Sequence, residues 1–131
     1  MLSIDQSRPL QKIEIFDFDK KTNSLHNRRT FAEIPLSLGK PDGFSMDEND
    51  HIWLALWDGN SLVEINPAGV IETKISMPAL KVSSCCFAGN DLKDIIITTS
   101  SKDDAEEYPL SGYVFAKKTK TKGKLSYRYK G

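Results

Sequence analysis

The sequence predicts an all-β fold built from sheets of short antiparallel strands, and three observations lead to this prediction. Apolar and polar residues alternate at period two in several segments, most clearly in 12–19 and 61–66. Turn-forming residues separate these segments. The strand predicted at 52–57 has a counterpart 43 residues later, at 95–100. A repeat of about 40 to 50 residues with four strands each is typical of the blades of a β-propeller.

One complete blade can be assigned from the pattern, and it has partial neighbours on both sides. From the innermost to the outermost strand, its segments are 42–47, 51–58, 61–66 and 70–77. The last three strands of the preceding blade are expected at 1–5, 12–19 and 27–34, and the following blade at 82–87, 94–100, 113–118 and 125–129. We therefore expect residues 1–131 to form a single domain, a partial β-propeller of about three four-stranded blades.

Composition fits a globular protein, with 39% hydrophobic and 27% charged residues. Net charge is zero, but all 18 acidic residues lie in 1–116, and residues 117–131 hold seven bases and no acid. Because threonine, leucine and tyrosine alternate with these bases, we favour a solvated edge strand over a nucleic-acid-binding tail. No segment has the roughly 20 consecutive apolar residues of a membrane span.

The two cysteines, Cys85 and Cys86, are neighbours in a predicted strand. Side chains of adjacent strand residues point to opposite faces, so a mutual disulfide would need strained geometry. Reduced cysteines, together with an N-terminus that lacks a secretory signal pattern, predict a cytoplasmic protein.

Three motifs carry a family resemblance. They are PDGFSMD at Pro41–Asp47, NPAG at Asn66–Gly69 and SSCCFAGN at Ser83–Asn90. In this order and spacing they resemble the regucalcin/gluconolactonase family, which includes the senescence marker protein and the insect luciferin-regenerating enzymes. The resemblance covers the whole chain, but only the C-terminal half of a family member. It implies a six-bladed β-propeller that holds a divalent metal at the mouth of its central channel and hydrolyses sugar lactones.

Asp42 occupies the position of the family's metal-ligating and proton-accepting aspartate, so the resemblance implies both roles for it. The other two ligands, a glutamate and an asparagine, have no counterpart in this chain. The resemblance leaves the metal open among calcium, zinc, manganese and magnesium. The residues alone favour a plainer interpretation, since Pro-Asp-Gly is common in turns.

Two functions therefore stay open. The first is a lactone hydrolase, incomplete and weakly active or inactive as this chain; the second is a non-enzymatic calcium-binding or scaffolding fragment. The missing half has three explanations: an incomplete gene model, an internal start or a short paralogue. Self-association through open blade edges is a further expectation, because exposed edges invite strand pairing.

Other motifs favour structural roles. His26 and His51 are 25 residues apart without zinc-ligand spacing, so a metal role for either is not expected, and His26 should be exposed. The acidic segment 47–50 should close a hairpin, with Asp50 in left-handed backbone. Trp53 and Trp57 should pack between blades.

Overall fold

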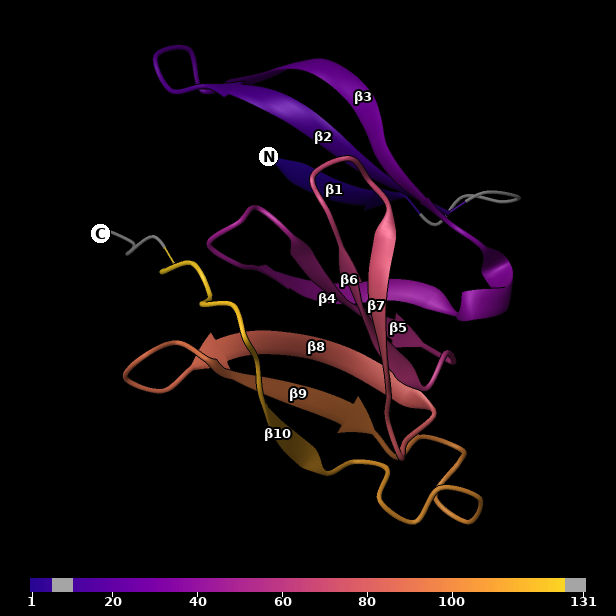
Figure 1. The fold of residues 1–131 in the computed structure, drawn as a ribbon. Coiled ribbons are helices and arrows are strands. Elements are labelled where there is room, and N and C mark those ends of the chain that lie inside the picture. The colour runs from indigo at the N-terminus through magenta and orange to yellow at the C-terminus, as the bar shows by residue number, and fades with distance from the viewer. Residues whose placement is uncertain (6–10, 127–131) are drawn as a thin grey trace.

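The computed structural model describes residues 1–5 and 11–126, which form three antiparallel sheets (Figure 1). Each sheet pairs strands that are neighbours in sequence. In chain order the strands are β1 (Leu2–Asp5), β2 (Gln11–Asp19), β3 (Ser24–Ile34), β4 (Lys40–Met46), β5 (Ile52–Trp57), β6 (Ser61–Ile65), β7 (Ile71–Ser76), β8 (Lys81–Ala88), β9 (Asp94–Ser100) and β10 (Val114–Lys118), with a 3-10 turn at Leu36–Leu38. Within the described ranges no helix is long and apolar enough to cross a membrane.

The predicted complete blade is confirmed. The middle sheet has the order β4-β5-β6-β7, and its strands agree with the assigned segments to within two residues at each end. The first sheet has the order β1-β2-β3 and the third pairs β8, β9 and β10. The prediction of about three propeller blades is thus correct.

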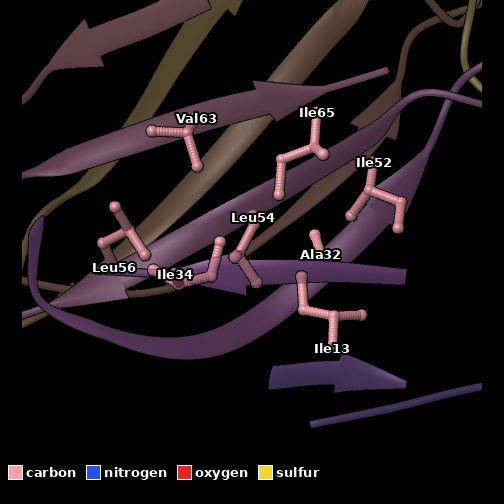
Figure 2. Close-up of a cluster of buried hydrophobic side chains, with 8 residues drawn as sticks. All are labelled: Ile13, Ala32, Ile34, Ile52, Leu54, Leu56, Val63 and Ile65. Atoms are coloured by element: carbon pink, nitrogen blue, oxygen red, sulfur yellow. The ribbon is translucent and has the colours of Figure 1, made fainter. Parts of the chain in front are cut away.

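The middle blade is buried on both faces, which explains why β5 does not alternate in polarity. All its residues except Trp57 are buried. One face of the sheet packs against the first blade through a cluster of aliphatic side chains (Figure 2): Ile13, Ala32, Ile34, Ile52, Leu54, Leu56, Val63 and Ile65. The opposite face packs against the third blade through Trp53, Ala55, Leu62, Met77, Val82, Cys85, Ile95 and Ile97. The first strands of these two blades, β4 and β8, also contact each other.

The basic C-terminal segment departs from the prediction of an edge strand. β10 is the edge of the third sheet but ends at Lys118. Residues 119–124, which we call the strap, leave the sheet and cross from the β8–β9 turn to the β4–β5 turn (Figure 1). Gly123 lies so close to the Phe87 ring that a Cβ would be 2.1 Å from it. This packing and the strap's hydrogen bonds to both turns favour the crossing over continued strand pairing.

Four backbone hydrogen bonds hold the strap in place. Thr119 and Gly123 donate N–H groups to the carbonyls of Lys93 and Leu92, at 2.8 and 2.9 Å. Glu48 donates its N–H to Lys122 at 2.7 Å, and Lys124 donates to Met46 at 3.0 Å. The predicted strand at 125–129 is wrong for Leu125 and Ser126, which are not in a strand, and its remainder lies outside the described residues.

The two tryptophans of β5 have different environments. Trp53 is buried between the second and third blades, with its ring edge-on to Phe87 at 6.0 Å, as predicted. Trp57 lies at the end of the strand, half-buried, with the Lys81 ammonium 5.9 Å from its ring centre. The sequence could not distinguish the environments of the two tryptophans, because both side chains lie on one face of the strand.

The cysteines are free and lie on opposite faces of β8, as predicted. Cys85 is buried and donates its S–H to the Trp53 carbonyl at 3.1 Å, whereas Cys86 is exposed. Burial raises the pKa of Cys85 from its ordinary 9.0 to about 12. Because the folded state holds this proton more tightly than the unfolded state, the stability that it contributes is complete below pH 9 and falls as the pH rises toward 12.

We expect the two thiols to differ in reactivity. Iodoacetamide at pH 8 should modify Cys86 and leave Cys85 unmodified, because only a thiolate reacts and Cys85 is both buried and protonated. Mass spectrometry of peptic peptides measures each site, and denaturant should equalise them. Equal labelling of both thiols in the native protein would contradict the buried position of Cys85.

Candidate active site around Asp42

Asp42 lies on a β-bulge in the innermost strand of the middle blade. β4 pairs with β5 through Pro41 opposite Leu56 and Phe44 opposite Leu54, so Asp42 and Gly43 together lie opposite the single residue Ala55. The prediction of a tight turn at Pro-Asp-Gly is corrected: the segment is part of a strand. A β-bulge changes the direction of the side chains on it, which explains how the Asp42 carboxylate on the innermost strand avoids the apolar space between the sheets.

Gly43 is required by close packing rather than by its backbone angle, since its φ is not positive. A Cβ at this position would lie 2.3 Å from the Ser84 hydroxyl and 2.9 Å from the Ser83 carbonyl of β8. The glycine therefore allows the first strands of two blades to approach beside Asp42.

Gly43→Ala is accordingly expected to lower the free energy of unfolding by about 1–3 kcal/mol, the usual effect of overpacking. Urea denaturation followed by tryptophan fluorescence measures the change. Adding Ser84→Gly should restore part of the loss, because it removes the nearest side-chain atoms. A Gly43→Ala protein as stable as the wild type would contradict the close approach.

The Asp42 carboxyl is half-buried, and burial raises its pKa above the ordinary 3.8, while a hydrogen bond from the Gly43 N–H opposes part of this shift. It borders a pocket of about 240 Å³ that is also lined by Lys40, Pro41 and Trp57. Among the described residues, Asp42 has no salt-bridge partner within 4.0 Å. A partly desolvated carboxylate without a cationic partner is a stronger proton acceptor than an exposed one.

The lysines near this pocket are held by other carboxylates. Lys40 lies 3.4 Å from Asp58, and Lys81 bridges Asp58 at 3.1 Å and the buried Asp104 at 3.9 Å. Asp58 thus forms ion pairs with both ammonium groups. The sequence analysis did not identify Lys40 and Trp57 as neighbours of Asp42. Pairing the two predicted strands in the correct register would have found them, because that register places Lys40 directly opposite Trp57.

The donor set at Asp42 allows a test of the implied metal. A hard dication takes six or more oxygen ligands, of which carboxylates are the strongest. The described lining of the pocket offers one carboxylate, one ammonium group, a proline and an indole. These residues fit one ligand of a shared coordination sphere and do not form a complete metal site.

At the opposite end of β4, Asp47 closes the hairpin to β5 and is completely buried. Its Oδ1 accepts the backbone N–H groups of Asn49 and His51 at 2.9 and 3.0 Å, and its Oδ2 accepts the Trp53 Nε1–H at 3.1 Å. The predicted hairpin is confirmed, and Asp50 has the predicted left-handed backbone, with φ 64°.

His51, for which no metal role was expected, lies beside several carboxylates. Its Nδ1 is 2.8 Å from Glu64 Oε1 and 3.7 Å from Glu72 Oε2. Potential ligand atoms of Asp47, His51 and Glu64 all lie within 4.8 Å of one another. The spacing rule for zinc motifs could not find this group, because its members come from three different strand ends. His26 is exposed, as predicted.

Stacked antiparallel sheets, with inner strands in contact and a carboxylate on an inner-strand bulge, define a protein of the β-propeller class. The chain belongs to the SMP-30/Gluconolactonase/LRE-like family, whose sequence profile matches residues 6–101.

Known proteins agree with this assignment. The chain is 34% identical over 120 residues to YvrE of Bacillus subtilis, which is named as a sugar lactone lactonase, covering 88% of this chain and 41% of that protein. It is 35% identical over 88 residues to pentonolactonase XacC of Haloferax volcanii, covering 67% of this chain and 30% of the other. The solved structure of regucalcin from Agrobacterium tumefaciens, titled a calcium-binding protein, superposes with a TM-score of 0.82 at 20% identity over 91% of this chain and 42% of its own, and shows the shared fold. The chain thus spans less than half the length of these relatives.

Proposed function

We propose that this chain supplies the part of a sugar-lactone hydrolase active site that contains Asp42. The observation that carries the proposal is the position of Asp42: a half-buried carboxylate with no salt-bridge partner among the described residues, on a bulge of an innermost strand, beside a pocket. Lactonases among the relatives support the substrate class. A divalent metal at this site would need further ligands. These would have to come from the part of the family fold that this chain does not span.

Asp42 has a defined task in this reaction. Hydrolysis joins a water oxygen to the lactone carbonyl carbon and breaks the ring C–O bond, and the proton lost by the water must reach the departing ring oxygen. Asp42 accepts this proton, for which its raised pKa suits it. Among the described side chains that line the pocket, it is also the one that can ligate a divalent metal, whose chemistry would be to polarise the lactone carbonyl. Calcium, zinc, manganese and magnesium all remain candidates.

Asp42→Asn tests the proposal through activity and stability together. We expect the wild-type chain to hydrolyse gluconolactone weakly in the presence of Mn²⁺, Zn²⁺ or Ca²⁺, and the variant to lose about 100-fold or more of the rate above buffer. The free energy of unfolding, unlike the rate, should not decrease in Asp42→Asn. Because the folded-state pKa of Asp42 is raised, its contribution to stability is present below pH 3.8 and lost as the pH rises through the folded pKa. Asparagine avoids this loss, so the variant should be at least as stable as the wild type at pH 7.

Asp91→Asn is the matched control, since Asp91 is an exposed carboxylate in a turn at the other end of the blades. It should leave the rate unchanged. Equal rates for wild type and Asp42→Asn would overturn the catalytic role and leave the calcium-binding or scaffolding alternative.

We also infer a cytoplasmic location, which the free thiols of Cys85 and Cys86 support. Self-association through open blade edges stays a prediction; it is supported by the exposure of Val114 and Tyr113 at the edge of the third sheet.

A further inference from the structure

A second group of potential ligands lies at the end of the middle blade opposite to Asp42. His51 precedes β5, Glu64 is on β6 and Glu72 is on β7, so three adjacent strands bring them together. Their side chains are 19%, 13% and 45% exposed, which makes His51 and Glu64 largely shielded and Glu72 accessible. The group is distinct from the Asp42 pocket, and nothing in the proposed lactonase reaction uses it.

Asp47 positions this group without being free to ligate. Three N–H groups already occupy both of its oxygens, and one of them is the backbone N–H of His51. The buried Asp47 carboxylate therefore fixes the His51 backbone through this hydrogen bond, and the fixed backbone holds the imidazole close to Glu64 and Glu72.

Two carboxylates approach one imidazole nitrogen. A single N–H can donate fully to one of them, and Glu64 at 2.8 Å takes it, so Glu72 Oε2 at 3.7 Å lies beyond hydrogen-bond distance of this nitrogen. Within the described residues, neither glutamate has a lysine or arginine within 4.0 Å. Glu72 is also held in place, because its Oε1 accepts the Asn66 Nδ2–H at 2.8 Å while Oε2 faces His51. A negatively charged, preformed arrangement of this kind favours a cation.

The distances suit a tetrahedral transition-metal ion. With metal–ligand bonds of about 2.0–2.2 Å, neighbouring ligand atoms of a tetrahedral site lie about 3.3–3.6 Å apart. The observed separations of 2.8 and 3.7 Å from Nδ1 bracket that range. An imidazole nitrogen also favours zinc and its neighbours over calcium, which prefers oxygen ligands.

A further observation points to this place independently. Glu64 lines a groove of about 370 Å³ together with Trp53, Thr121 of the strap and three lysines, Lys117, Lys118 and Lys120. The Thr121 Oγ1 is buried and has no hydrogen-bond partner. The groove offers a path to Glu64, and Thr121, whose hydroxyl is unused, is part of its lining.

We propose that His51, Glu64 and Glu72 bind a zinc-class divalent metal ion through His51 Nδ1 and one oxygen of each glutamate, with a water as the fourth ligand. The ion displaces the Nδ1 proton and joins the ends of three strands of the middle blade. Its role is structural, at the end of the blade opposite to the proposed catalytic carboxylate.

Zinc titration of the full chain tests the proposal. All proteins should carry Cys86→Ser, so that the exposed thiol does not bind the ion. Isothermal titration calorimetry with Zn²⁺ should show one saturable site, and Co²⁺ should give the visible absorption of tetrahedral coordination. His51→Gln and Glu72→Gln should each weaken Zn²⁺ binding by at least about tenfold. His26→Gln, which changes an exposed histidine, should leave the affinity unchanged.

Three outcomes would overturn the site. Two of them are no saturable Zn²⁺ binding by the parent protein and parent-like affinity in His51→Gln or Glu72→Gln. Because Glu72 is nearly half exposed, its variant should fold normally and keep the test decisive if His51→Gln unfolds. Loss of binding in Asp42→Asn alone would place the zinc at the Asp42 pocket instead and would equally refute the site.

Discussion

Replacing Asp47 with alanine is expected to lower the free energy of unfolding by about 3–5 kcal/mol, because three N–H groups lose their acceptor at once. The indole N–H of Trp53 suffers most, since it is buried between two blades and water cannot replace the carboxylate there. The loss is large relative to the 5–15 kcal/mol that usually stabilises a domain. Urea denaturation monitored by tryptophan fluorescence measures it.

Asp50→Asn is the matched control for this variant. Asp50 is in the same turn, is exposed and pairs with Lys124, and asparagine tolerates its left-handed backbone. Its effect should stay below about 1 kcal/mol, as for other surface ion pairs. An Asp47→Ala protein within 1 kcal/mol of the wild type would show that the turn does not depend on the buried carboxylate.

Leu54→Ala should lower the free energy of unfolding by about 3–4 kcal/mol. Leu54 is 0% exposed and lies at the centre of the cluster between the first and second blades (Figure 2). Because β5 is enclosed on both faces, neighbouring side chains have little freedom to fill the cavity, and the cost should stay above the lower end of the usual range.

Two further variants make the Leu54 measurement specific. Leu54→Met keeps the volume and should lose less than about 1.5 kcal/mol. Val114→Ala, at a residue 65% exposed on an edge strand, should change stability by less than about 0.5 kcal/mol. If Leu54→Ala behaved like Val114→Ala, the assignment of this cluster as the core would be wrong.

The strands could be predicted from the sequence because each local signal agrees with the global fold. Period-two alternation identified β2 and β6, and Asn66–Gly69 marked the turn after β6. The order of the strands followed from their spacing. The enclosed β5 was found from its counterpart 43 residues later, although it lacks alternation.

The site was predicted less completely, for a physical reason. Asp42 was identified from its family motif, but the bulge that aims it depends on the pairing between β4 and β5, which local sequence does not determine. The contact of His51 with Glu64 and Glu72 likewise needs the register of three strands. The strap was misassigned because lysine-rich alternating residues satisfy an edge strand equally well, and only the packing of Gly123 on Phe87 decides between the two.

The strap also has a consequence for how the protein folds. Its hydrogen bond between Lys122 and Glu48 joins residues 74 positions apart, whereas neighbouring strands of the middle blade join through short turns. Closing so long a loop is entropically unfavourable until the intervening sheets have formed. During synthesis the earlier blades can therefore assemble hairpin by hairpin, and docking of residues 119–124 should be a late step that locks their mutual orientation.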